Sequence, residues 1–219
     1  MGPMSTQPPE ALTEATLVAA ARRLADRDPG LAGVLDRYGP PPLWARDPGF
    51  ATLLNIILEQ QVSLASAQAA FDRLQQAADP LTPHSFLTLD DGQLLAIGFS
   101  RQKARYGRLL SAALLDGSLD LDALPSIDDE AVDERLTAVS GIGPWTATIY
   151  RLMALGRPDA WPVHDIALAQ ALAEIRGLAA RPTSDEMLGH AEDWRPWRAV
   201  AARILWHHYL SVRAERRAR

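Results

Sequence analysis

The helical spacing of apolar residues is the feature that most restricts what this chain can fold into. Apolar side chains recur three and four positions apart between Phe50 and Leu58, and again between Leu109 and Leu114. That period places them on one face of an α-helix, and no segment alternates well enough to form a half-buried strand. The sequence therefore predicts an all-α fold of short helices, over about 10–26, 29–38, 48–59, 63–77, 83–88, 91–97, 100–115, 128–138, 144–155 and 164–175, with a last pair over 184–214.

Capping signals mark several of these helix starts. Asp28-Pro29, Asp47-Pro48 and Thr82-Pro83 each pair a capping side chain with a proline at the first helical position. Ser126-x-x-Asp129 and Thr183-x-x-Glu186 have the spacing of capping boxes.

The composition excludes several classes of protein. Of the 219 residues 47% are hydrophobic, which is enough for a proper core, and there is no cysteine. Disulfides, thiolate zinc sites, iron–sulfur clusters and cysteine nucleophiles are therefore excluded. No apolar run approaches the length of a membrane span.

The charge is segregated although its sum is −5. Residues 92–115 hold four bases and no acid, residues 195–219 are rich in arginine, and residues 116–134 hold acids and no base. Basic and acidic faces of this kind suit a nucleic-acid partner, but basic helix ends are often only solvated, so charge alone leaves both readings open.

A glycine hairpin is the most specific local motif. Gly141 and Gly143 join two predicted helices, and the second begins at Pro144. Its unpaired N–H groups and the positive end of the helix dipole would meet a phosphate there, and the Thr146 hydroxyl could add a contact. A bare Gly-x-Gly is more often an ordinary helix–helix turn, but the longer pattern through Thr146-Ala147 is more specific.

Five motifs in order resemble one family. In chain order these motifs are Glu59-Gln60-Gln61-Val62-Ser63, Ile97-Gly98-Phe99-Ser100, the hairpin, Trp161-Pro162-Val163-His164-Asp165, and Trp194 to Trp206. Over residues 14–212 the sequence resembles the helix-hairpin-helix (HhH-GPD) DNA glycosylases, in their 3-methyladenine DNA glycosylase II branch, in a short form without the N-terminal β-rich domain.

The resemblance implies a domain organisation. We expect residues 1–13 to be a disordered or cloning-derived leader, and residues 14–45 plus 160–215 to form one discontinuous helical subdomain. Residues 46–159 would form the other and carry the helix-hairpin-helix at 136–155. The family's active-site cleft lies between two such interlocked subdomains.

Asp165 has two readings. Taken alone, an acid that opens an apolar helical stretch is usually a cap. By resemblance it is the catalytic carboxylate, which would stabilise the oxocarbenium-like sugar formed as an N-glycosidic bond breaks. Lyase branches of the family carry a nucleophilic lysine where this chain has Trp145, so the resemblance implies hydrolysis to an abasic site without AP lyase activity.

The remaining site residues follow from the resemblance. Trp145 and Trp206 would line the base pocket with Ile149. Ile149 stands where the best-known members have tyrosine, so the pocket would lose one aromatic wall and the resemblance does not fix the substrate range. Gln61 would fill the gap left by the flipped base.

The hairpin implies contacts to phosphate and to an ion. Phosphates would meet Gly141, Gly143 and Thr146, with Arg101 and Lys103 of the basic helix. No cofactor is expected for the chemistry, but backbone carbonyls would hold Na⁺ or K⁺; by resemblance these belong to Thr137, Val139 and Ile142.

The expected function is release of an alkylated base, of the 3-methyladenine or 7-methylguanine type, from double-stranded DNA in base excision repair. The protein would act as a monomer, away from membranes, in the bacterial cytoplasm at the nucleoid. Two alternatives remain: a non-catalytic helix-hairpin-helix DNA-binding protein, and a glycosylase for oxidised, deaminated or mismatched bases.

Overall fold

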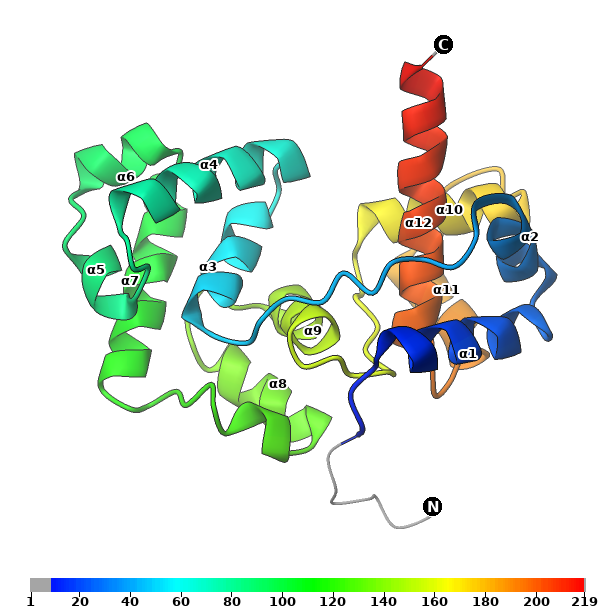
Figure 1. Cartoon of the computed structure of the whole chain (residues 1–219), viewed down its shortest axis with the longest axis horizontal. Coiled ribbons are helices and arrows are strands. Elements are labelled where there is room, and N and C mark those ends of the chain that lie inside the picture. The colour runs from blue at the N-terminus through cyan, green and yellow to red at the C-terminus, as the bar shows by residue number, and fades with distance from the viewer. Residues whose placement is uncertain (1–8, 219) are drawn as a thin grey trace. The chain divides into compact units, whose positions relative to one another are not determined.

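The computed structural model describes residues 9–218, and the described chain is entirely helical (Figure 1). The helices are α1 Glu14–Ala25, α2 Pro29–Tyr38, α3 Phe50–Glu59, α4 Leu64–Ala77, α5 Pro83–Leu87, α6 Asp91–Ile97, α7 Arg101–Leu115, α8 Asp129–Thr137, α9 Pro144–Met153, α10 Ile166–Arg176, α11 Ser184–Glu192 and α12 Arg198–Arg217, with a short 3₁₀ helix, η1, at Leu124–Ser126. The prediction of an all-α fold is confirmed. Most of the predicted leader, residues 1–8, lies outside the described residues.

The described chain divides into two compact units. One is the continuous segment 46–155, and the other combines residues 9–45 with residues 156–218. The chain therefore leaves the discontinuous unit once and returns to it after Leu155, whereas the sequence analysis placed this return after residue 159.

Helix α3 is the centre of the 46–155 unit. It packs against α4, α7 and α9, and Leu53, Leu54, Ile56 and Ile57 are fully buried. The apolar residues whose spacing predicted this helix are thus buried against the surrounding helices. The buried phenol of Tyr150, on α9, accepts a hydrogen bond of 2.9 Å from the N–H of Gly49 at the start of α3.

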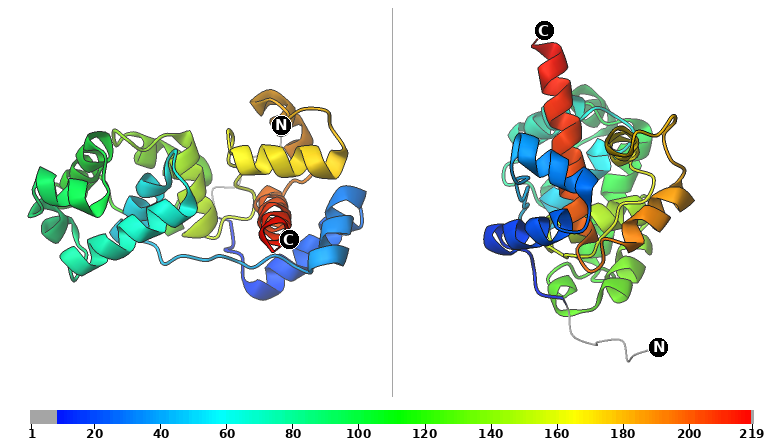
Figure 2. Two further views of the ribbon diagram at one scale, coloured as in Figure 1. Left: turned by 90° about the horizontal axis from the view of Figure 1, so that it is seen from above. Right: turned by 90° about the vertical axis from the view of Figure 1, so that its right-hand side faces the viewer.

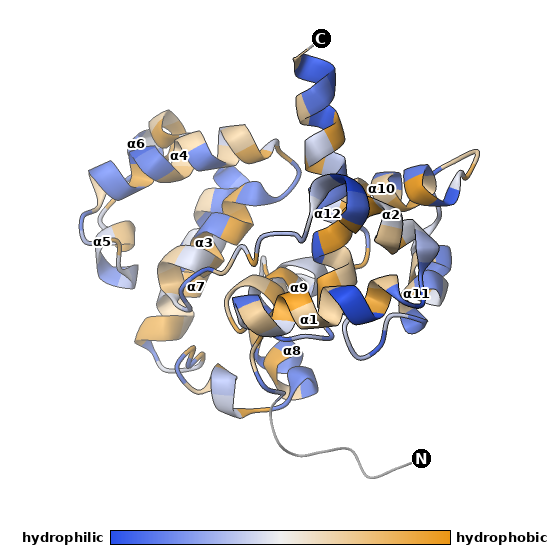
Figure 3. Cartoon of the chain, turned by 45° about the vertical axis from the view of Figure 1, so that its right-hand side comes forward, coloured by the Kyte–Doolittle hydropathy of each residue, from blue (hydrophilic) through white to orange (hydrophobic). Residues whose placement is uncertain are grey.

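Helix α12 has the same central role in the other unit. It packs against α10, α2, α1 and α11, and seen along its axis it lies between α10 and the α1–α2 pair (Figure 2). The last turns of α12 are hydrophilic (Figure 3) and expose Arg213, Arg216 and Arg217.

A buried carboxylate joins α2, α10 and the turn between α11 and α12 in this discontinuous unit. Asp28 caps α2, accepts a hydrogen bond of 2.7 Å from the indole of Trp194, and pairs with Arg176 of α10. Burial raises the pKa of Asp28, but the hydrogen bonds from Arg176, Trp194 and the Leu31 N–H outweigh it and hold that pKa below its usual value.

Three of the predicted caps are confirmed. Asp28 caps α2, Thr82 caps α5, and Thr183 forms a capping box with Glu186 at α11.

Two predicted caps are wrong. Ser126 lies in η1 and its hydroxyl donates to the Ala123 carbonyl, so α8 is capped instead by Asp128. Helix α3 is capped by Gly49 without a side-chain hydrogen bond rather than by Asp47. Ser126 and Asp128 both precede α8, and Asp47 precedes α3, so the path of the chain decides which residue caps each helix.

Candidate functional site

The hairpin joins α8 to α9 through a compact loop. The Ile142 N–H donates to the Val139 carbonyl at 3.0 Å, and both side chains are buried. The loop therefore turns its apolar side chains inward and leaves glycine backbone at its surface.

The two hairpin glycines lie in different surroundings. Gly141 has φ of 102°, and a Cβ there would lie 2.2 Å from the Tyr106 ring. Gly143 has an ordinary extended backbone, with φ of −89° and ψ of 176°, and a Cβ there would meet nothing within 4 Å. Packing therefore explains Gly141, whereas the missing side chain at Gly143 leaves open space above the loop.

That open space lies at the N-terminus of α9. Pro144 occupies the first turn, and no side chain caps the helix. The N–H groups at such an end have no partner within the helix, and the helix dipole adds positive potential. The end is therefore suited to bind an anionic oxygen through the backbone.

Thr146 has a different role from the one predicted. Its side chain is only 2% exposed, and its hydroxyl accepts a hydrogen bond of 2.9 Å from the Gln60 amide. The same amide nitrogen donates to the Gly141 carbonyl at 3.0 Å. The predicted phosphate contact from the Thr146 hydroxyl is therefore wrong, because this group faces inward and links the hairpin to the end of α3.

A pocket of about 400 Å³ opens beside the loop, within the 46–155 unit. Three segments form it: the end of α3, the start of α7 and the hairpin. Its lining residues are Gln60, Gln61, Gln102, Lys103, Tyr106, Thr137, Val139, Ser140, Gly141, Ile142 and Gly143. The pocket gathers most of the residues predicted to contact DNA or an ion in this unit. Arg101 does not line it, but is exposed at the start of α7.

Lys103, the chain's single lysine, is anchored within this pocket. Its amine donates to the Leu58 carbonyl at 2.6 Å, and burial lowers the pKa of Lys103 below its usual value. One of its three donors is thus committed to the last turn of α3, a contact that the sequence did not indicate.

Arg151 clamps the two helices of the hairpin together. Its guanidinium, on α9, contacts Asp129 and Asp133 of α8 at 2.8 Å each, and the residue is 9% exposed. Burial raises the pKa of Asp133, against the opposing charge of Arg151. The i,i+4 spacing of the two acids on α8 was a signal for this clamp that the sequence analysis did not use.

Asp165 lies at the N-terminus of α10 in the discontinuous unit. Its Oδ1 accepts a hydrogen bond of 3.0 Å from the Leu168 N–H, and the residue is half-buried. The preceding residue, His164, has φ of 69°, and its Nδ1 lies 2.6 Å from the Ser184 hydroxyl. A left-handed backbone and a side-chain tether thus fix the turn from which the carboxylate projects.

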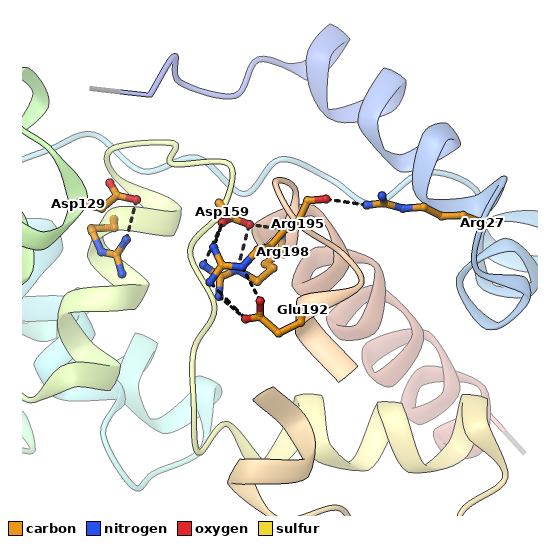
Figure 4. Close-up of polar contacts among 7 residues, drawn as sticks. Arg27, Asp129, Asp159, Glu192, Arg195 and Arg198 are labelled. Carbon is orange, nitrogen blue, oxygen red and sulfur yellow. Dashed lines mark hydrogen bonds and ion pairs between the residues drawn. The ribbon is translucent and has the colours of Figure 1, made fainter. Parts of the chain in front are cut away.

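The loop leading to Asp165 is held by an ion-pair network. Asp159 lies 2.9 Å from both Arg195 and Arg198, and Glu192 lies 2.8 Å from Arg195 (Figure 4). The backbone N–H of Arg198 also donates to Asp159. This network ties the loop to the start of α12.

The predicted pocket walls differ in exposure. Trp145, on α9, and Trp206, on α12, are half-buried and belong to different units. Ile149 is 3% exposed, so its side chain is buried. Its place in a pocket wall stays a prediction.

The sequence prediction assigns a monovalent cation to three backbone carbonyls at the hairpin. We consider the backbone hydrogen bonds of the described residues other than those within helices. Among them, one is accepted by the Val139 carbonyl and none by the carbonyls of Thr137 and Ile142. All three residues line the same pocket. Within residues 9–218, no three His, Cys, Asp or Glu side chains gather as metal ligands.

Comparison with known proteins identifies the family. Residues 54–196 match the sequence profile of the HhH-GPD superfamily of base excision DNA repair proteins. The chain belongs to this superfamily. Among the helices of the described HhH-GPD chain, none has both the length and the apolar character that a membrane span needs.

Several glycosylases are similar to this HhH-GPD chain. DNA-3-methyladenine glycosylase 2 of Escherichia coli is 28% identical over 80% of this chain and 64% of the relative. The solved structure of Schizosaccharomyces pombe 3-methyladenine DNA glycosylase (Mag1) with abasic DNA has a TM-score of 0.80 and 25% identity, over 86% of this chain and 95% of that one. The chain spans 64% and 42% of the first curated relatives, from Bacillus subtilis and Mycobacterium tuberculosis.

Proposed function

We propose that this chain is a monofunctional DNA glycosylase that flips an alkylated base, of the 3-methyladenine or 7-methylguanine type, out of duplex DNA and hydrolyses its N-glycosidic bond. The observation that carries the proposal is the hairpin, whose Gly143 leaves open space at the uncapped N-terminus of α9. The likeness to 3-methyladenine glycosylases, one of them bound to abasic DNA, supports both the reaction and the partner.

The hairpin would hold the DNA backbone without reading sequence. Backbone N–H groups of α9 would bind a phosphate, with Arg101 and Lys103 adding positive charge from α7. The carbonyls of Thr137, Val139 and Ile142 would bind Na⁺ or K⁺, which would add positive charge beside that phosphate. Gln61, exposed next to the hairpin pocket, would fill the gap in the base stack.

Asp165 would act on the extruded nucleotide. Its carboxylate is fixed by the Leu168 N–H, and it would stabilise the positive charge that develops on the sugar and orient the attacking water. An alkylated purine is already cationic, so it leaves without a general acid and is attracted to aromatic faces such as Trp145 and Trp206. Trp145 cannot form a Schiff base, so the reaction would end at the abasic site.

We further propose that the protein works as a monomer on chromosomal DNA of a bacterial nucleoid. Similar glycosylases from Bacillus subtilis, Mycobacterium tuberculosis and Escherichia coli support this setting.

The experiment is base release from methylated duplex DNA by the wild type and by Asp165→Asn. We expect a loss of at least about 100-fold in single-turnover rate, because the variant lacks the charge that stabilises the transition state. Binding to an abasic-site analogue should change little. Near-normal release by the variant would contradict the mechanism.

Two further outcomes identify the alternatives. No release by the wild type from any methylated, deaminated or oxidised base would indicate a non-catalytic DNA-binding protein. Release restricted to oxidised, deaminated or mismatched bases would indicate the other glycosylase classes. Borohydride should trap no covalent adduct, and a trapped adduct would reveal an amine nucleophile.

A further inference from the structure

The turn between α3 and α4 has almost no packing of its own. Residues 61–66 are all exposed, including the apolar side chains of Val62 (47%) and Leu64 (60%). Gln61 has φ of 57°, a left-handed conformation that costs a non-glycine residue about 1–2 kcal/mol. Burial of its own side chains therefore does not explain why this turn keeps its shape.

Ser63 caps α4 from within the turn, and Gln60 supplies a restraint from outside it. Its Nε2 donates to the Gly141 carbonyl at 3.0 Å and to the Thr146 hydroxyl at 2.9 Å, across more than 80 residues of sequence. The backbone N–H of Gln60 donates to the Ile57 carbonyl, so the residue belongs to the end of α3. One side chain thus ties the start of the exposed turn to the phosphate-facing loop.

The loop that receives this bond is held on its other side. The Tyr106 ring occupies the space where a Cβ of Gly141 would lie. Lys103, from the same helix as Tyr106, donates to the Leu58 carbonyl. The hairpin and the end of α3 are therefore fixed to each other and to α7 within one unit.

We propose that Gln60 is a positioning residue that couples the hairpin to the exposed turn, so that the grip on a phosphate and entry into the base stack are made by one rigid surface. This inference rests on the proposed function. Its ligand is duplex DNA with a gap in the stack beside the gripped phosphate. The phosphate contact alone should bind intact DNA and DNA with a gap in the base stack equally well. The coupling should therefore appear as tighter binding to DNA with the gap.

The test compares two variants of the link: Gln60→Leu removes both of its hydrogen bonds, and Thr146→Val removes the one to the hydroxyl. Gln60→Leu keeps the size of the side chain but loses its amide, and Thr146→Val keeps the shape but loses the hydroxyl. Gln68→Leu, on the exposed face of α4, is the matched control. Thr146→Ser retains a hydroxyl and should behave like the wild type.

The first measurement is the ratio of dissociation constants for intact duplex and for a duplex with a tetrahydrofuran abasic analogue. We expect each variant to lower the preference for the abasic duplex by about tenfold, equivalent to ~1.4 kcal/mol. The double variant should be no worse than Gln60→Leu, because that variant alone already removes both hydrogen bonds of the link. Equal losses on both duplexes, additive losses, or an unchanged ratio would overturn the coupling.

The second measurement needs no DNA. Hydrogen exchange of the amides in residues 61–63 and 141–143 should become faster in Gln60→Leu and Thr146→Val, but not in Gln68→Leu. Unchanged exchange in both variants would refute the coupling. If the wild type neither prefers abasic DNA nor releases a base, the proposed function fails, and exchange still decides whether Gln60 fixes the turn. Thr146→Val carries the test if Gln60→Leu does not fold.

Discussion

The contrast between the two hairpin glycines gives a sharp test of the phosphate site. Gly143→Ala adds a methyl group where the structure leaves open space, at a backbone conformation that alanine adopts without strain. The free energy of unfolding should change by less than about 1 kcal/mol, and could rise because alanine restricts the unfolded chain. The methyl group would stand between the backbone and an approaching phosphate.

Gly141→Ala should have the opposite profile. Its Cβ would lie 2.2 Å from Tyr106 and would require φ of 102° from alanine. Overpacking costs about 1–3 kcal/mol and a left-handed backbone about 1–2 kcal/mol, so we expect a loss of ~2–5 kcal/mol. For a chain of this size the melting temperature should fall by roughly 5 to 15 °C.

Both variants are compared by thermal melting and by fluorescence anisotropy with duplex DNA at fixed salt. Gly143→Ala should melt like the wild type and bind at least about tenfold more weakly, which is ~1.4 kcal/mol. Wild-type binding by Gly143→Ala would refute the assignment of this helix end as the phosphate site. A stable Gly141→Ala would refute the packing argument.

Two further predictions concern buried ion pairs. Asp28 has a lowered folded pKa, so its contribution to stability is present above its ordinary value of 3.8 and is lost as pH falls further. Asp28→Asn should lower the free energy of unfolding by ~3 kcal/mol at pH 7. Its melting temperature should also fall less steeply than that of the wild type between about pH 5 and 3, and an equally steep fall would contradict this. Arg151→Met should cost ~2–3 kcal/mol, because it leaves Asp129 and Asp133 without their shared guanidinium, whereas exposed Arg135→Met should change stability by less than ~0.5 kcal/mol in urea unfolding. Equal effects of the two arginine variants would argue against the clamp.

Helix positions were predictable because their signals are local. The apolar period and the caps at Asp28, Thr82 and Thr183 lie within a few residues of the starts they specify. Ser126 and Asp47 carried similar signals and were not used as caps, because η1 and the Tyr150 phenol decide those positions through the path of the chain. Local chemistry offers candidates, and tertiary structure selects among them.

The site was less predictable, since its contacts join distant segments. Gln60, which links α3 to the hairpin, is indistinguishable in sequence from its neighbour Gln61. The inward hydroxyl of Thr146 and the bond from Lys103 to Leu58 likewise depend on helices that meet only after folding. By contrast, the importance of Gly141 and Gly143 was visible, although the sequence could not show that they serve different purposes.

The discontinuous unit has a consequence for how the protein is made. Residues 9–45 emerge from the ribosome before the 46–155 unit, but α1 and α2 pack against α12, which is synthesised after that unit. The 46–155 unit has all its contacts in one stretch of chain and is free to fold while the remainder is still being translated. A polypeptide that stops before α12 would therefore keep the hairpin but lack the central helix of the unit that carries Asp165. Such a fragment would keep the proposed DNA contacts of the hairpin without the support for the proposed catalytic carboxylate, so the proposed chemistry requires that α12 has been synthesised.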